Sequence, residues 1–147
     1  MNTFALQSFG GEFYFTLAAA PLGRDGRVLE FAGASHPPAR VVQPGERPRL
    51  LESQSRALGL LEEAVNGEAT IKVPLQAGDR LVIYTDGFNE TFYAREEELG
   101  IDGLTEIVRE ASKRPLPEMK QTILDRIAAW QSGPAADDLS LVVVGVL

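Results

Sequence analysis

Two short acidic segments, far apart in the chain, are the residues best suited to chemistry. Asp86 lies in the pentad Tyr84-Thr85-Asp86-Gly87-Phe88, directly after an apolar run that is typical of a buried strand. Asp137 and Asp138 directly precede a second apolar run, residues 139–144. Strands distant in sequence can be neighbours in a sheet, and two such strands could direct both acidic segments at one cation. We therefore predict a metal site formed by carboxylates.

The composition restricts the kind of metal. The chain has no Cys and a single His, His36. A thiolate site is thereby excluded, and a His-rich zinc site is disfavoured. Carboxylates and water are the ligands that hard cations prefer, so Mg²⁺ and Mn²⁺ are the candidates.

Length and charge indicate the class of protein. A chain of 147 residues has the length of one domain, and we expect a single domain over residues 1–147. The formal charge of -7, with scattered basic residues, argues against a nucleic-acid partner. No apolar run reaches the roughly 18 residues of a spanning helix, and the start of the chain does not resemble a signal peptide. We expect a cytoplasmic protein without a membrane partner, which the absence of Cys also fits.

Strands are expected to position these residues in the first half of the chain. Turn signals separate extended segments, which predict an antiparallel meander over residues 12–17, 27–32, 39–43, 48–51, 70–73 and 80–85. Residues 53–66, interrupted by Gly59, are interpreted as a loop over the sheet. The last apolar run, residues 139–146, is apolar on both faces, which is typical of a central, covered strand.

Two amphipathic helices are expected in the second half. The first has Asp102 as a candidate N-cap and ends before Pro115, and the second has Pro117 in its first turn. Met119 and Trp130 belong to an apolar stripe of the second helix, which favours a role in core packing. The acidic run 96–98 is interpreted as a solvated face.

The order and spacing of several segments resemble the SpoIIE-type, RsbU- and RsbX-like branch of the PPM metal-dependent serine/threonine protein phosphatases. The resemblance covers essentially the whole chain, and the pairing of a Thr-Asp-Gly segment with a terminal Asp-Asp segment is its most specific feature. The matching segments are Phe15-Thr16, residues 31–38, Leu58-Gly59-Leu60, residues 77–90, Leu99-Gly100 and residues 137–140.

The resemblance implies an α+β fold of layered antiparallel sheets flanked by helices, with a centre of two Mn²⁺ or Mg²⁺ ions that activates water. It implies that Asp86 and Asp137 ligate the same metal ion, with Asp138 in a supporting role. Gly87 and Glu90 would support the Asp86 turn. His36 matches the family's Ala-Gly-His-Pro segment, in which the usual Gly is here Ser35. The implied substrate is a phosphoserine or phosphothreonine on a regulatory protein of the anti-sigma-factor antagonist type.

The start of the chain departs from the family pattern. The complete family domain opens with a Gly-Asp strand whose aspartate bridges both metals, but residues 1–11 contain no Asp and Glu12 is the nearest acidic residue. The chain thus resembles the C-terminal part of the domain and would hold at most one metal weakly, because affinity rises with the number of charged ligands. An apolar surface is expected where the missing elements would pack, and a homodimer could cover it.

Two hypotheses follow. The chain is the C-terminal portion of a metal-dependent phosphoprotein phosphatase, or it is a non-catalytic phosphatase-like module that binds a regulatory protein. The single residues also have structural alternatives. Asp86 and the pair Asp137-Asp138 could be ordinary turn residues. For His36 we favour a structural role, in which the imidazole hydrogen-bonds loop backbone, over that of a general acid.

Overall fold

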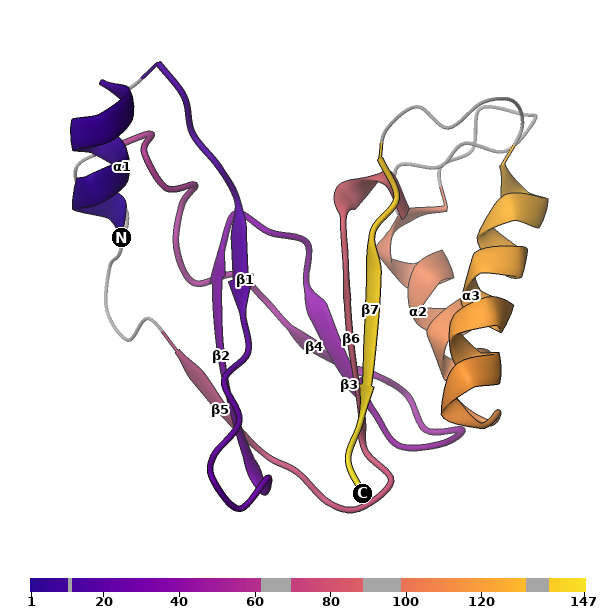
Figure 1. The fold of residues 1–147 in the computed structure, drawn as a ribbon. Coiled ribbons are helices and arrows are strands. Elements are labelled where there is room, and N and C mark those ends of the chain that lie inside the picture. Colours follow the sequence, from indigo (N-terminus) through magenta and orange to yellow (C-terminus); the bar gives the residue numbers. More distant parts are fainter. Residues whose placement is uncertain (11, 62–69, 89–98, 132–137) are drawn as a thin grey trace. The chain divides into compact units, whose positions relative to one another are not determined.

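The computed structural model describes residues 1–10, 12–61, 70–88, 99–131 and 138–147. Its contacts divide the chain into two compact units, residues 1–38 with 51–76 and residues 39–50 with 77–147 (Figure 1). The described residues form two antiparallel sheets and three α-helices, so the predicted α+β class is confirmed. The expectation of a single domain over residues 1–147 stays a prediction.

The first unit contains a three-stranded sheet in the order β1-β2-β5. Its strands are β1 (Leu17–Ala19), β2 (Val28–Ala34) and β5 (Ile71–Pro74), and both pairs are antiparallel. The antiparallel pairing of the first two predicted strands is confirmed, because β1 pairs with β2 and places Ala18 opposite Gly33. The first strand is shorter than expected: among the described residues before Leu17, strand-like pairing is limited to an isolated bridge between Phe15 and Leu58.

The helix α1 (Asn2–Phe9) was not predicted from the sequence. It has eight residues and no side-chain cap, and isolated helices of this length are unstable in water. Tertiary contacts stabilise it instead, because Ala5 is fully buried against Ala34 and Leu58. The Asn2 side chain also accepts from the Gly59 N–H at 2.9 Å.

Gly59 makes the close approach beside α1 possible. Its φ is +89°, and a Cβ at this position would lie 2.8 Å from the Phe13 carbonyl oxygen. Only glycine avoids both the backbone strain and the overlap. The Gly that interrupts the apolar run of residues 58–61 is therefore required by packing. Of the loop predicted over residues 53–66, residues 62–66 lie outside the described residues.

The second sheet has the order β4-β3-β6-β7. Its strands are β4 (Arg49–Leu51), β3 (Ala39–Val42), β6 (Arg80–Tyr84) and β7 (Leu141–Gly145), and β6 pairs antiparallel with both β3 and β7. The prediction of one simple meander is therefore wrong. The strands β2 and β3 follow each other in sequence but belong to different sheets. Pro37 and Pro38 lie between them, and proline cannot donate the backbone hydrogen bond that a continuous ladder needs.

The helices α2 (Gly100–Ala111) and α3 (Leu116–Trp130) lie side by side against β6 and β7 (Figure 1). Pro117 is in the first turn of α3, as predicted. Met119 is fully buried and Trp130 packs against the same core, so the structural interpretation of both residues is confirmed. The predicted N-cap, Asp102, is three residues late. Leu99 is the N-cap, and Asp102 lies in the first turn, where a negative charge complements the helix dipole.

The strand β7 is not the covered central strand that its composition suggested. Among the described residues it is an edge of the sheet, with Val142 53% and Val144 36% exposed. Leu141 and Val143 pack against the helical core. A strand that is apolar on both faces requires cover on both, and the described residues supply that cover on the helical side alone.

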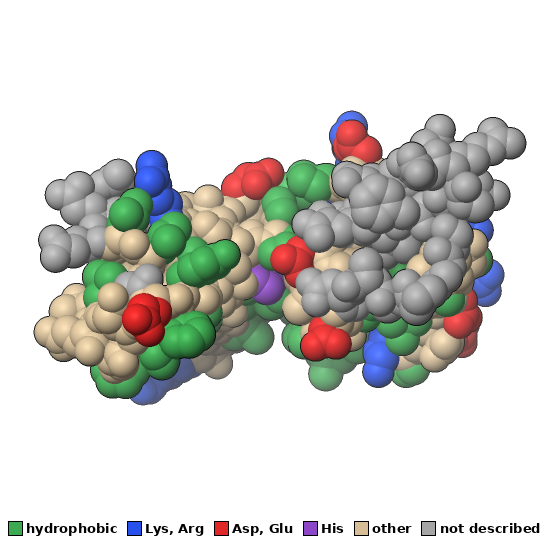
Figure 2. Space-filling view, turned by 90° about the horizontal axis from the view of Figure 1, so that it is seen from above, with side chains coloured by type: hydrophobic (Ala, Val, Ile, Leu, Met, Phe, Trp, Pro, Cys, Tyr) green, Lys and Arg blue, Asp and Glu red, His purple; other side chains and the backbone are tan. Residues whose placement is uncertain are grey.

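Apolar residues are also exposed in the first unit. Figure 2 shows green side chains gathered on this unit, at the left, and its most exposed aromatic residues are Phe4 (70%), Phe13 (65%) and Tyr14 (64%). Exposed apolar surface of this kind commonly marks an interaction site. Separately, no helix in the described part of the chain is long and apolar enough to cross a membrane.

Candidate metal centre

The two acidic segments predicted from the sequence meet at one end of the second sheet. The strands β6 and β7 are antiparallel, and their pairing places Tyr84 opposite Leu141. Asp86 follows the end of β6, and Asp138 precedes the start of β7. Figure 1 shows η1 (Asp86–Phe88) at the same end of the strand pair as the start of β7. The two segments are therefore neighbours in the fold.

Thr85 holds the two segments together through three hydrogen bonds. The Thr85 N–H donates to the Ser140 carbonyl oxygen at 3.1 Å. The Ser140 N–H donates to Thr85 Oγ1 at 2.9 Å, and the hydroxyl donates to the Asp138 carbonyl oxygen at 2.8 Å. The sequence placed Thr85 in the motif but did not indicate this role. The available signal was the residue type, because threonine can extend a ladder from its side chain where regular pairing ends.

Asp86 is exposed at the start of η1, whereas the residues after it are buried. The Gly87 N–H donates to Asp86 Oδ1 at 3.2 Å. Phe88 is fully buried, and its ring meets the Tyr84 ring edge-on at 6.0 Å between centroids. The buried Phe88 anchors the turn, and the Asp86 carboxylate is presented at the surface. An exposed carboxylate on an anchored turn is suited to ligate a hard cation.

The acidic groups fit a complete two-metal centre only in part. Asp138 is exposed beside the Asp86 turn, whereas Asp137 and Glu90 lie outside the described residues. Within the described ranges, no three acidic or histidine side chains form a group that could hold a metal. Carboxylates are the correct donors for Mn²⁺ or Mg²⁺, and in the described part of the chain Asp86 and Asp138 bring two of them to this end of the sheet.

His36 belongs to the first unit, where its backbone is fixed by Ser53. The Ser53 hydroxyl accepts from the His36 N–H at 2.9 Å and donates to the His36 carbonyl oxygen at 2.7 Å. The imidazole Nδ1 lies 3.4 Å from the Thr16 hydroxyl. The Thr16 contact is with a side chain, whereas a contact of the ring with loop backbone was expected. The role of His36 stays a prediction.

The residue before His36 has an unfavourable backbone conformation. Ser35 has φ of 45°, the sole positive value of a non-glycine residue in the described segments. This is the position at which the resembled family usually has Gly. The left-handed conformation costs a residue with a Cβ about 1–2 kcal/mol, and glycine avoids that cost.

We predict that Ser35→Gly raises the free energy of unfolding by up to about 1 kcal/mol, because relief of strain exceeds the extra entropy of the unfolded chain. Urea denaturation followed by circular dichroism measures the change. Ser35→Ala, which keeps the Cβ, is the matched control and should give no such gain. Equal effects of Gly and Ala would contradict the strain argument.

A second prediction concerns Thr85. Thr85→Val keeps the shape but removes the hydroxyl that bonds Asp138 and Ser140. The hydroxyl makes two hydrogen bonds, each of which contributes a net stabilisation of about 0.5–1.5 kcal/mol. Because the site is partly solvated, we expect the free energy of unfolding to fall by about 1–2 kcal/mol, less than the maximum of that sum. Thermal denaturation measures this loss. Thr85→Ser retains the hydroxyl and should restore most of the stability; if it behaves like Val, the hydroxyl is not the cause.

The architecture is that of the PP2C phosphatases, as comparison with solved structures shows. The SiaA-PP2C domain of Pseudomonas aeruginosa has a TM-score of 0.79 at 24% identity, over 97% of this chain and 55% of that one. The RsbU and RsbW domains of Rv1364c from Mycobacterium tuberculosis give 0.75 at 20% identity, over 97% and 38%. The Mn-presoaked phosphatase domain of the cell fate determinant SpoIIE from Bacillus subtilis gives 0.67 at 16%, over 89% and 56%.

The family follows from the sequence itself. Residues 1–147 match the family described as Stage II sporulation protein E (SpoIIE), and the chain belongs to this family. Among curated proteins, none is similar enough to count as a match. The chain spans between 38% and 56% of the lengths of the three solved relatives. The resemblance seen in the sequence is thereby confirmed for family and fold.

Proposed function

We propose that this chain is the C-terminal portion of a metal-dependent serine/threonine phosphoprotein phosphatase. One observation carries the proposal: the Thr85 hydrogen bonds hold the Asp86 turn beside the Asp138 segment, at one end of the β6–β7 pair. Membership of the SpoIIE family and the PP2C-type fold support it. Neither alone would assign an activity to a chain that spans about half of its relatives.

We assign metal binding to Asp86 and Asp137, with Asp138, Gly87, Glu90 and His36 in supporting roles. The cation would be Mn²⁺ or Mg²⁺, as the carboxylate donors require. A bound cation of this kind lowers the pKa of a coordinated water and neutralises phosphoryl oxygens. The protein residues would present carboxylates from the rigid β6–β7 end and so orient the ion. The donor set described above suits one ion, so further ligands are needed for efficient catalysis.

The exposed apolar surfaces are consistent with this need. Val142 and Val144 of β7, and the aromatic residues of the first unit, are apolar side chains in contact with solvent. We propose that chain elements corresponding to the remaining length of the relatives, or a second copy of this chain, cover these surfaces in the working enzyme. In the first case, the additional chain elements would also supply the bridging carboxylate.

The proposed substrate is a phosphoserine or phosphothreonine on a regulatory protein, of the anti-sigma-factor antagonist type that the family resemblance implies. The relative from Mycobacterium tuberculosis contains an RsbU and an RsbW domain in one solved structure. The net charge of -7 disfavours a nucleic-acid substrate. The proposed location is the cytoplasm, which the absence of Cys fits.

The test is release of phosphate from a phosphoserine antagonist protein, with Mn²⁺ added or chelated. We expect slow, Mn²⁺-dependent release by the 147-residue chain and none by Asp86→Asn. A second sample adds, as a separate polypeptide, the part of the SiaA-PP2C domain that lies outside the 55% matched by this chain. Stimulation by this part that depends on Asp86 would support completion of the site by further chain elements.

The alternative function is a non-catalytic module that binds a regulatory protein. The small donor set in the described part of the chain is the observation that favours it. This alternative predicts that the chain binds the phosphorylated antagonist in a pull-down, equally with and without Mn²⁺, and releases no phosphate in any sample. Such a result would overturn the enzyme proposal.

A further inference from the structure

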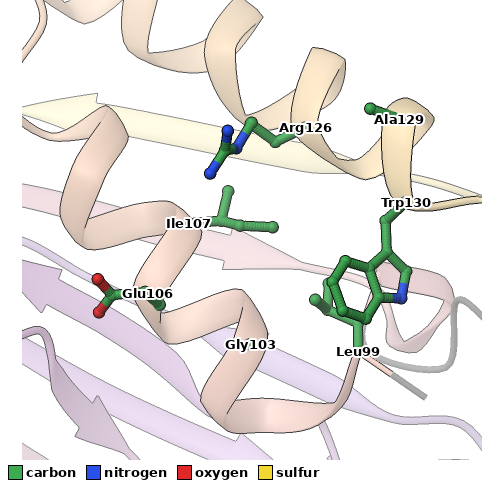
Figure 3. A pocket seen from close by; sticks show the side chains of 7 residues that line it. All are labelled: Leu99, Gly103, Glu106, Ile107, Arg126, Ala129 and Trp130. Atoms are coloured by element: carbon green, nitrogen blue, oxygen red, sulfur yellow. The ribbon is translucent and has the colours of Figure 1, made fainter. Parts of the chain in front are cut away.

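A cavity of about 350 Å³ lies between the two helices of the second unit (Figure 3). None of its lining residues belongs to the candidate metal centre. Its volume falls at the lower end of the range for ligand pockets, roughly 300–1,000 Å³. The lining residues are Leu99, Gly103, Glu106 and Ile107 from α2 and the residue before it, and Arg126, Ala129 and Trp130 from α3.

The walls of this cavity are mainly apolar. Leu99 and Ile107 are buried side chains of the helical core, and Figure 3 shows the Trp130 indole beside Leu99. The lack of a side chain at Gly103 lets the Leu99 side chain lie against the backbone of α2, because a Cβ at position 103 would lie 2.5 Å from Leu99 Cδ1. These surfaces would accept a compact apolar body, and an indole face is well suited to an aromatic ring.

The two charged residues at the cavity differ in their partners. The Glu106 carboxylate accepts from Arg109 Nε at 2.9 Å and from Arg109 Nη2 at 2.5 Å. The hydrogen bond from Arg109 lowers the pKa of Glu106, which is therefore ionised and paired at neutral pH. Arg126 is exposed, forms no ion pair within the described ranges, and projects over Ile107 in Figure 3. The cavity thus presents one unbalanced positive charge above apolar walls.

We propose that this cavity binds a small molecule with one carboxylate on a compact aryl or branched alkyl body. The carboxylate would pair with Arg126, whose planar guanidinium can donate two parallel hydrogen bonds to it. The apolar body would lie against Leu99, Ile107 and Trp130. The cavity is bounded by two helices and has the volume of a compact molecule, which favours a free ligand over an extended peptide.

The test uses 3-phenylpropionate as the probe. Trp130 is the single Trp of the chain, so its fluorescence reports occupancy directly. We expect saturable binding of the acid, and about tenfold weaker binding of 3-phenyl-1-propanol, because a charge-assisted hydrogen bond is replaced by a neutral one. No metal is added, so this test is independent of the proposed phosphatase activity.

Two variant pairs locate the site. Arg126→Gln should weaken binding of the acid about tenfold and abolish its advantage over the alcohol. Lys120→Gln, which removes a charge elsewhere on α3, should leave both unchanged. Ala129→Phe fills the cavity and should abolish binding, whereas Ala128→Phe, at an exposed neighbour outside the lining, should not. Isothermal titration calorimetry provides a second readout.

Three outcomes would overturn the proposal. The first is equal affinity for the acid and the alcohol, and the second is unchanged binding by Arg126→Gln. The third is binding of a peptide that ends in Phe without binding of 3-phenylpropionate, which would make the occupant a protein segment. Each leaves the phosphatase proposal unaffected, because the metal centre shares no residue with this cavity.

Discussion

Asp86→Asn is expected to weaken binding of Mn²⁺ to this chain by about tenfold or more. Substitution of a residue that only contacts a metal ligand already weakens metal binding by about tenfold, and loss of a ligand should weaken it at least as much. Asn has the shape of Asp but lacks the negative charge that gives a carboxylate its higher affinity for a hard cation. The Gly87 N–H can still donate to the amide oxygen, as it does to Asp86 Oδ1 at 3.2 Å. The turn should therefore survive while the ligand is lost. Isothermal titration calorimetry measures the dissociation constant.

The matched control is Asp125→Asn. Asp125 is exposed on α3 and accepts from Gln121, so its substitution removes the same charge without touching the candidate centre. We expect its Mn²⁺ affinity to equal that of the unchanged chain. If both variants lose affinity equally, Mn²⁺ responds to net charge alone. If neither does, Asp86 is a turn residue and not a ligand. Asp138→Asn tests the supporting role of Asp138. We expect this variant to lose less Mn²⁺ affinity than Asp86→Asn.

Arg40→Ala is expected to lower the free energy of unfolding by about 3–4 kcal/mol, the range of large buried side chains replaced by Ala. Arg40 on β3 is fully buried. Its Nε donates to Thr105 Oγ1 at 3.3 Å, and its Nη2 donates to the Ile101 carbonyl oxygen at 3.1 Å. The guanidinium also lies 4.7 Å from the centre of the Tyr84 ring. Urea denaturation measures the loss.

Arg40→Met tests how much of this loss is packing. Methionine replaces most of the stem, and the Ile101 oxygen stays satisfied because the Thr105 hydroxyl donates to it at 2.7 Å. We expect a loss of about 1–2 kcal/mol, because filling the volume removes the cavity term. A Met variant as unstable as the Ala variant would mean that the polar contacts dominate. An Ala variant within 1 kcal/mol of the unchanged chain would contradict a structural role for Arg40.

Much of the fold could be predicted because its signals are local. The apolar run before Asp86, the hairpin of β1 and β2, and the stripe of α3 that includes Met119 all arise from residue type and spacing. The misses have a common cause. The helix α1 is too short and weakly patterned to be recognised without its buried Ala5, and β7 has the composition of a covered strand but lies at the edge of the described sheet.

The candidate site also has one part that the sequence predicts and one part that the fold decides. Its donors could be chosen from the sequence, because a chain without Cys and with one His has carboxylates as its main charged ligands for a metal ion. That the Asp86 and Asp138 segments are neighbours depends on the register of β6 against β7 and on the bonds of Thr85. Neither is encoded in any short stretch of chain, so pairing was a hypothesis until the fold was known.

The sequence by itself determined the family, the strand ends that carry acidic residues and the chemical type of the ligands. These properties depend on residue identity and on spacing along the chain. The tertiary structure decided which strands share a sheet, that Arg40 is buried while Val142 is exposed, and that Arg126 stands unpaired over an apolar cavity within the described residues. The physical reason is that burial and strand pairing depend on contacts between residues tens of positions apart. The free energies of such contacts cannot be read from a local sequence pattern.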